Sequence, residues 1–398
     1  MATTESPQLD LLDPDFYPAG PEPTYAWLRA NAPVYRDETN GLWWVSRHRD
    51  VMMIERDTRR YSSASGSRPL IEMSESMINK DDPFHSRQRK LVAARFTPGA
   101  VRHHEDHVRD LVTGLLDAVV AGGRAEVVAD LAAPLPAMVI AELLGFDRSM
   151  WPRAKMWSEV TMANGGFRAG DARAPGGSEE AIADFAAAIM ELIAARQAEP
   201  RDDLVSVWLH SPLDGSLLPV SEVVQEALLL LDGGAETTRA VIGQIVLALT
   251  RHPDQRRLLL DDPARIGQTG VEEFIRWVTP ILNMRRTATE DHVLHGQTIR
   301  AGDQVVLMYA SANCDEEVFD DPDRFLVTRS HNHHVAFGFG THFCLGANLA
   351  RLELRVVFEE LLRRIPDFEL APEASPEILP GHFTRTLRDL PIVFSPAG

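Results

Sequence analysis

The chain has 398 residues, of which 44% are hydrophobic, and this is enough apolar material for a sizeable core. Its 40 basic and 58 acidic residues give a net charge of −18, which argues against nucleic acid or an anionic membrane as a general partner. Two cysteines are too few for a disulfide framework and fit a reducing cytoplasm. Residues 1–23 form a proline-rich lead-in without an apolar signal segment, and no stretch has the roughly 20 apolar residues of a membrane span.

The segment after the lead-in predicts a small β-rich corner. Residues 24–31 have the pattern of a short helix. Two β-rich runs follow, 34–36 and 42–45, and the Asn-Gly pair between them is a strong hairpin signal. A second short helix is predicted over residues 50–56. Length alone permits two or three domains or one large unit.

Residues 62–80 are polar and irregular, and they include Met73 and Ile78. This composition predicts a loop, with disorder as the alternative. The next segment predicts a helix that carries His85 and Arg89 at i and i+4, hence on one face. Such a cationic pair can hold two carboxylates, and a solvated basic helix is the alternative.

From residue 100 to residue 201 the spacing of alanine and leucine predicts mostly helix. The break is a stretch rich in glycine and proline over residues 163–177, and Gly166 lies in it. Such a gap is either a linker between two helices or a moving lid, and its glycine content fits a moving part.

A long helix is predicted from Ser221, as its cap, to about Arg251. Its first part, which includes Leu229, is apolar all round, so we expect the helix to be central. Its middle reads Gly233-Gly234-Ala-Glu-Thr-Thr, and each glycine costs about 1 kcal/mol relative to alanine. A ligand that needs close approach would explain this local weakness. A kinked core helix, whose threonine bonds the carbonyl four residues before it, is the alternative.

Two further signals come before the last third of the chain. Glu273 and Arg276 stand at i and i+3 on a predicted helix, which by itself is an ordinary surface pair. Pro280 then forces extended chain. The residues after it predict a strand that ends near Arg286, although Arg285 beside it leaves the register open by one residue.

Cys344 lies between Gly340 and Gly346, just before an apolar helical run that starts at Ala347. The helix dipole and the free N–H groups there favour a negative sulfur. The two glycines lack Cβ atoms, so the backbone can approach something large and flat. One thiolate in an apolar turn is the proximal ligand of a thiolate-bound haem. A structural cysteine in a glycine-rich turn is the alternative, and a zinc site is disfavoured because no paired cysteine or histidine spacing is present.

The run Phe-x-x-Gly-x-His-x-Cys-x-Gly from Phe337 to Gly346 resembles the haem signature of the cytochrome P450 family. The resemblance extends over nearly the whole chain, with the family's motifs in order. It implies a mainly α, single-domain fold with a smaller β-rich region, spanning residues 1–398. It implies haem b as the cofactor and a cytoplasmic monomer without a membrane anchor. Cys314 departs from the family pattern, in which many members have arginine there.

The resemblance also implies roles for residues. Cys344 would be the axial ligand of the haem iron, and Glu236 with Thr237 would deliver protons for oxygen activation. The pair Glu273 and Arg276 would be structural, joining the segment before the cysteine loop to the core. The implied cofactor-binding residues are His85, Arg89, Arg286, His342, Cys344, Phe337 and Gly338. The implied substrate contacts are Met73, Ile78, Gly166, Leu229, Gly233, Ile281, Leu282, Met284 and Phe383.

The implied activity is a monooxygenase that hydroxylates an unactivated C–H bond of a hydrophobic small molecule, with O2 and with electrons from a ferredoxin and its reductase. Phrases around Cys344, Asp130 and Gly233 look similar to actinobacterial hydroxylases of steroid side chains of the cholesterol or cholestenone type. A tailoring oxygenase of a macrolide or terpenoid is the runner-up. A haem-binding sensor or carrier without activity is the alternative from another class, and Glu236-Thr237 argues against it. The candidate docking charges for the electron donor are Arg87, Lys90, Arg102 and Arg351.

Overall fold

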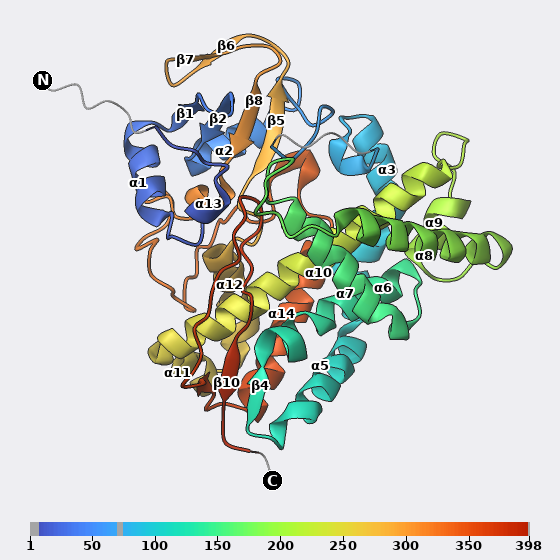
Figure 1. The fold of residues 1–398 in the computed structure, drawn as a ribbon, viewed down its shortest axis with the longest axis vertical. Helices are drawn as coiled ribbons and strands as arrows, with labels where there is room; N and C mark the ends of the chain where they lie inside the picture. The colour runs from blue at the N-terminus through green and yellow to red at the C-terminus, as the bar shows by residue number, and fades with distance from the viewer. Residues whose placement is uncertain (1–7, 70–74, 397–398) are drawn as a thin grey trace, which may run out of the picture.

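The computed structural model describes residues 8–69 and 75–396. Helices dominate the fold, as expected, and Figure 1 shows them packed around one long helix that crosses the molecule. Among these residues, no helix is both long enough and apolar enough to cross a membrane. The α-helices are α1 (Glu22–Asn31), α2 (His48–Arg56), α3 (Phe84–Ala93), α4 (Pro98–Arg102), α5 (Glu105–Val120), α6 (Pro134–Leu144), α7 (Trp151–Asn164), α8 (Ser178–Ala198), α9 (Leu204–His210), α10 (Val220–Arg251), α11 (Pro253–Asp261), α12 (Val271–Val278), α13 (Tyr309–Ala312) and α14 (Ala347–Arg364).

The predicted β-rich corner is confirmed and is larger than the hairpin alone. It is a five-stranded sheet in the order β1-β2-β8-β5-β3, in which β1 and β2 form the predicted hairpin and β8 joins β2 in parallel. A three-stranded sheet, β4-β10-β9, lies at the opposite end of the molecule (Figure 1). The strands are β1 (Val34–Asp37), β2 (Leu42–Val45), β3 (Tyr61–Ser62), β4 (Arg124–Glu126), β5 (Met284–Ala288), β6 (His292–Leu294), β7 (Gln297–Ile299), β8 (Gln304–Leu307), β9 (Glu369–Leu370) and β10 (Pro391–Val393).

Helix α10 is the central element. It runs unbroken for 32 residues, which is about 48 Å at 1.5 Å per residue. Its first residue is Val220 with Pro219 before it, so the prediction of Ser221 as the cap is wrong. Every residue from Thr238 to Leu249 is buried, because α6, α7, α12 and α14 pack around it. A ligand can therefore reach the middle of α10 only where these four helices leave its surface uncovered.

The C-terminal segment returns to the centre of the molecule, as a substrate contact at Phe383 requires. Thr384 forms a β-bridge with Ile281, and the backbone N–H of Leu282 donates to the carbonyl of Phe383 at 2.9 Å. This pairing places Phe383 beside the strand β5 and buries it fully. Segments a hundred residues apart in the chain thus form one wall near the middle of α10.

Candidate functional site

The loop before α14 holds Cys344 in a defined turn. The Cys344 N–H donates to the carbonyl of Phe337 at 2.9 Å, and α14 begins three residues later. Gly340 has φ +70°, and a Cβ there would lie 2.6 Å from the Glu55 carbonyl of α2. Its glycine is thus needed for packing against α2, which corrects the prediction that it approaches a flat ligand. At Gly346, by contrast, a built Cβ would have no atom within 4 Å. This glycine therefore leaves the open space that the approach of a flat ligand requires.

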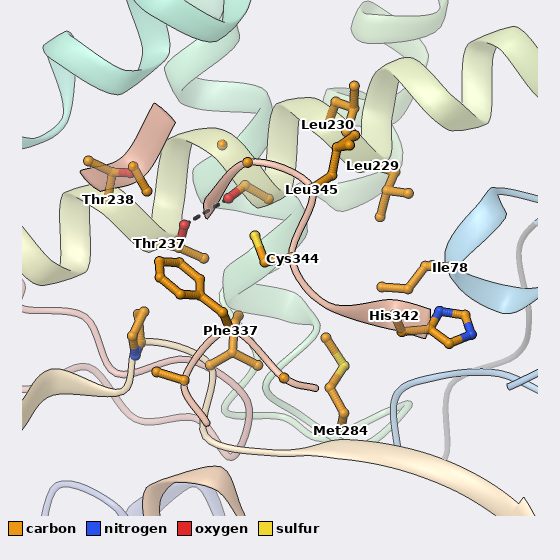
Figure 2. Close-up of a pocket in the computed structure, with 18 of the residues that line it drawn as sticks. Ile78, Leu229, Leu230, Thr237, Thr238, Met284, Phe337, His342, Cys344 and Leu345 are labelled. Carbon is orange, nitrogen blue, oxygen red and sulfur yellow. Dashed lines mark hydrogen bonds between the residues drawn. The ribbon is translucent and has the colours of Figure 1, made fainter. Parts of the chain in front are cut away.

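A cavity with a volume of about 250 Å³ lies between this loop and the middle of α10. Figure 2 shows Cys344 on its loop beside α10, with Thr237 and Thr238 in one direction and Leu229 and Leu230 in the other. Apart from a few polar groups, the lining is apolar.

Cys344 lines this cavity. Burial raises the pKa of the thiol, whereas N–H groups of Gly346 and Ala347 and the cations Arg89 and Arg351 lower it. The N–H groups at the helix N-terminus therefore act in the predicted direction, and burial of the thiol acts against them. A bound metal ion deprotonates a coordinating thiol outright.

Cations and imidazoles gather at one side of the cavity. The rings of His85 and His342 lie 3.9 Å apart between centroids. Burial and the nearby cations lower the pKa of His342 to about 2, so it stays neutral. Arg89 lines the cavity, and within the described chain no carboxylate pairs with it. An always-charged guanidinium without a partner in a buried site calls for an anion.

Arg286 also lines the cavity, whereas Arg285 bonds the backbone carbonyls of the loop at Gly66, so the register is settled in favour of Arg286. Its guanidinium pairs with Glu55 at 2.8 Å, and the Tyr309 hydroxyl donates to the same carboxylate. Glu55 stands in no local motif, because it meets Arg286 across 231 residues of chain.

These residues fit a haem. The cavity-facing thiol would hold its iron, and Arg89 with His85, His342 and Arg286 would offer cationic and polar groups to its two carboxylates. The described residues contain no group of three or more His, Cys, Asp or Glu side chains that could hold a metal ion, so no zinc cluster competes with this assignment.

The two predicted catalytic residues on α10 face different ways. Thr237 lines the cavity, and its hydroxyl donates to the Gly233 carbonyl at 2.7 Å. This is the hydrogen bond to the carbonyl four residues before it that the alternative of a kinked core helix predicts. Glu236 is buried outside the lining and pairs with Arg239, which also holds Glu159 of α7 at 2.8 Å. Neighbouring residues on a helix point about 100° apart. Glu236 therefore does not line the cavity, and its role in relaying protons toward Thr237 stays a prediction.

The two adjacent glycines of α10, Gly233 and Gly234, have different roles. A Cβ on Gly233 would meet nothing within 4 Å, so this glycine opens the helix surface to the cavity as predicted. A Cβ on Gly234 would lie 3.0 Å from Ile140, so this glycine lets α6 pack closely against α10. The helix stays regular through both positions.

Most predicted substrate contacts line the cavity, and they are Ile78, Leu229, Gly233, Ile281, Met284 and Phe383. Leu282 does not, because it packs with Val306 in the N-terminal core cluster. Gly166 does not either, since a Cβ there would lie 3.1 Å from Gly381, whose close packing it permits. Met73 lies outside the described residues. Phe337 and Gly338 line the cavity as expected.

Two cavity residues were missed by sequence reasoning. Glu353 of α14 is buried among apolar groups, which raises its pKa to about 8, and it interacts with the Thr238 hydroxyl. Arg68 reaches the cavity from the loop after β3. Neither stands in a local motif, so only the packing of distant segments reveals them.

The Glu273 and Arg276 pair is fully buried, with bonds of 2.8 and 2.9 Å between the guanidinium and the carboxylate. Arg276 also donates to the carbonyl of Asn313 at 2.8 Å, and Arg329 donates to Glu273 at 3.0 Å. The pair thus ties α12 to the segment that leads into the cysteine loop, outside the cavity.

Comparison with known proteins agrees with this site. A sequence model of the family described as Cytochrome P450 matches residues 268–388. The steroid C26-monooxygenase of Mycolicibacterium smegmatis is 41% identical over 98% of this chain and 97% of that protein. The chain belongs to the cytochrome P450 family. The methyl-branched lipid omega-hydroxylase of Mycobacterium tuberculosis is 37% identical over 93% of this chain and 90% of its own length.

The P450 fold is equally clear. The structure of Mycobacterium marinum cytochrome P450 CYP268A2 in complex with pseudoionone covers 99% of this chain and 100% of its own, with a TM-score of 0.90 and 35% identity. This P450 is a monooxygenase that uses haem b and O2, takes electrons from redox partners and hydroxylates hydrophobic molecules. The haem supplies the oxygen activation when it is bound.

Proposed function

We propose that this P450 hydroxylates the terminal methyl group of a steroid side chain of the cholestenone type. The observation that carries the proposal is the largely apolar cavity that lies between the Cys344 loop and the middle of α10. An extended hydrocarbon fits such a cavity because burying apolar surface stabilises it by roughly 25 cal/mol per Å². The relatives named for steroid C26 oxidation and for methyl-branched lipid omega-hydroxylation support the choice of a chain end.

The protein's own residues supply orientation, dryness and protons. Leu229, Ile281 and Met284 hold the hydrocarbon and exclude water. The Thr237 hydroxyl oxygen keeps lone pairs free after its proton bonds Gly233, so it can fix a water beside the oxidised carbon. Glu353 carries a proton at neutral pH because its pKa is about 8, and it can pass that proton through the Thr238 hydroxyl. Glu236 instead anchors α10 to α7 through Arg239.

We infer a cytoplasmic monomer that receives its electrons from a ferredoxin with its reductase. Among the docking candidates, Lys90 and Arg102 form no ion pair within the described chain. Arg351 is less available to a partner protein, because it pairs with Glu272 at 2.6 Å and lies over the Phe337 ring. Phe343, next to the ligand, is 38% exposed and offers an apolar contact for a partner. The charge-reversed Lys90→Glu should slow electron transfer without changing steroid affinity.

The test is a titration of the ferric protein with cholest-4-en-3-one, followed by its visible spectrum. A blue shift of the Soret band that saturates at micromolar steroid supports the proposal, because it reports displacement of water from the iron. A haem spectrum that does not respond to the steroid contradicts the substrate and directs the search to macrolides and terpenoids.

The variant Thr237→Ala distinguishes a haem carrier or sensor from an enzyme. A carrier has no need of a hydroxyl at this place, so its haem binding would not change. An oxygenase would lose product for each electron that it consumes.

A further inference from the structure

A short turn that lines the cavity is held by one buried carboxyl group. The 3₁₀ turn Met77–Asn79 brings Met77 and Ile78 to the cavity lining, and Figure 2 shows Ile78 among the residues that line it. The Met77 N–H donates to Oε1 of Glu226, which belongs to α10 and is 0% exposed. Glu226 itself does not line the cavity, so it acts on a bound molecule only through the turn that it holds.

The Glu226 carboxyl group has few partners for a buried charge. Besides Met77, its Oε1 accepts a hydrogen bond from Nε2 of Gln88 at 2.9 Å, and its Oε2 is buried without a partner among the described residues. The Lys80 ammonium pairs instead with Glu222 at 2.5 Å and with Oε1 of Gln88 at 2.8 Å. An ionised carboxylate without a cation at such a place is costly, because it loses its water and gains no counter-charge.

Burial decides the protonation of this group. Burial, helped by the carboxylate of Glu222 one turn earlier on α10, raises the pKa of Glu226 from 4.5 to about 7. The Met77 N–H, the Lys80 ammonium and the Gln88 amide lower this pKa and do not outweigh burial. Near neutral pH, Glu226 is thus partly protonated, and in its neutral form Oε1 still accepts the Met77 N–H.

Helices α3 and α9 also bring titratable or charged side chains to this region, and none of them bonds Glu226. They are His85, whose Nδ1 lies 2.8 Å from the Met77 carbonyl, Arg87, which pairs with an exposed carboxylate, Arg89, which lines the cavity, and His210, which bonds a backbone carbonyl of α8. A change at Glu226 alone therefore removes one titration and leaves the others.

We propose that Glu226 is a positioning residue, which holds the turn Met77–Asn79 over the cavity as a neutral carboxylic acid and weakens substrate binding when it ionises. A carboxylate without a cation is more stable in water than in this buried place. It gains water when the turn moves away from α10, so ionisation favours the open position. The inference concerns the closing of the cavity and does not depend on which molecule is the substrate.

The direction of the pH dependence follows from the two positions of the turn. With the turn in place, the pKa of Glu226 is about 7, and with the turn lifted the hydrated carboxyl group has its ordinary pKa of 4.5. The closed position therefore holds a proton that the open position releases above pH 4.5. This contribution to closing is fully present below pH 4.5 and is lost as the pH rises through 7. An uncharged substrate should therefore bind more weakly at pH 8 than at pH 6.

The first experiment measures the turn itself by hydrogen–deuterium exchange of the haem protein without substrate. The peptide that holds residues 77–80 is followed at pH 6 and pH 8, and its rates are corrected for the intrinsic effect of pH on amide exchange. Wild-type protection should fall roughly tenfold from pH 6 to pH 8, and protection in Glu226→Gln should change by less than about twofold. Glutamine keeps an oxygen that accepts the Met77 N–H and carries no charge. Equal protection of the wild-type peptide at both pH values would overturn the proposal.

Glu222→Gln is the matched control, because it removes a carboxylate from the same face of α10, but one that pairs with Lys80 and is 21% exposed. Its peptide should lose protection between pH 6 and pH 8 as the wild type does. A fall that persists in Glu226→Gln would belong to another titrating group and would contradict the assignment. A fall that disappears in Glu222→Gln as well would contradict it too, because the net charge of this face would then control the turn.

Soret titration with cholest-4-en-3-one, which has no titratable group, extends the test to binding. Its dissociation constant should rise by up to roughly tenfold from pH 6 to pH 8 in the wild type and stay within about twofold in Glu226→Gln. A constant affinity in the wild type would contradict the control of binding by Glu226. No response to the steroid at either pH would remove only the proposed steroid substrate, because the exchange experiment needs no substrate.

Discussion

The two sides of the cavity are held together by different means. On the ligand side, the Glu273 and Arg276 pair is 0% exposed, and its remaining hydrogen bonds go to backbone and side chains of the segment before Cys344. On the substrate side, the stretch after α7 is tied to the N-terminal segment by ion pairs of Arg173 with Asp13 and Asp15, both at 2.8 Å and half exposed. Buried, fully bonded pairs fix geometry, whereas exposed pairs contribute little and yield to salt.

This difference shows how the molecule can keep its chemistry constant while its substrate changes. The cysteine loop must keep its position relative to the haem iron that it would bind, so the ion pair that supports the loop is buried. The segment over the substrate must open for an apolar molecule to enter, so weak ties suit it. The predictions below test the two sides in order of expected effect.

The largest effect is expected on the ligand side. Arg276→Ala takes the cation that makes two hydrogen bonds away from the buried Glu273 carboxylate and leaves it only Arg329, which should lower the free energy of unfolding by about 3 kcal/mol. Urea unfolding and haem content measure this loss. Arg324→Ala is the control, because the Arg324 and Asp321 pair of the same segment is exposed. Equal unfolding midpoints for the two variants would show that the buried network does not fix this side.

Thr237→Ala tests the face of α10 between the two sides. We expect the ratio of product to electrons consumed to fall roughly tenfold or more, because the hydroxyl that orients water and protons is gone. Measuring product and NADH consumption together gives this ratio. Thr250 of the same helix bonds the Leu247 carbonyl at 2.7 Å and does not line the cavity, so Thr250→Ala should keep the ratio of the wild type. A drop of the same size in both variants would contradict a role for the cavity hydroxyl.

Glu353 links α14 to α10 and makes the stability of the protein depend on pH. Burial raises its pKa from 4.5 to about 8, so the folded state holds a proton that the unfolded state releases above pH 4.5. Its contribution is fully present below that pH and is lost as the pH rises through 8, by up to about 1.4 kcal/mol per unit.

Glu353→Gln removes this titration. Relative to the wild type, the variant should therefore gain stability between pH 5.5 and pH 8, as measured by urea unfolding. Glu369→Gln, at an exposed carboxylate of β9, should follow the wild type. A constant difference between wild type and Glu353→Gln across this range would place the carboxyl of Glu353 in a wetter site than the structure gives it.

The smallest effect is expected on the substrate side. Arg173→Ala removes the tie to the N-terminal segment and should raise the rates of steroid entry and exit by roughly two- to threefold, with little change in unfolding. Stopped-flow mixing at low and high salt measures these rates, and salt should reproduce the variant. Arg153→Ala, which breaks the equally exposed pair with Asp184, is the control. Rates that depend on neither Arg173 nor salt would mean that this tie does not limit access.

Sequence reasoning located the features that are local in the chain. The Cys344 turn, the length of α10 and the Glu273 and Arg276 pair each follow from residues a few positions apart. Helix faces were less certain, because a pattern of glycines and polar residues does not say which face meets the cavity, so the sequence did not show that Glu236 lies outside the cavity lining. Gly340 was misread in the same way, since the atom that it must avoid belongs to α2.

Contacts across the chain could not be predicted at all. Arg68 meets Met162 and Phe383, and Glu55 meets Arg286, only after the segments between them have folded. An isolated arginine or glutamate in a sequence reads as a solvated surface residue. The cysteine loop could therefore be predicted from the sequence, whereas these contacts around the cavity could not.

The most direct test of the account is turnover of cholest-4-en-3-one by the purified protein with a ferredoxin, its reductase, NADH and isotopically labelled dioxygen. The account predicts a product hydroxylated at the terminal methyl of the side chain that carries one labelled oxygen atom, with no product from Cys344→Ser. A product oxidised on the rings, or one whose oxygen comes from water, would contradict it.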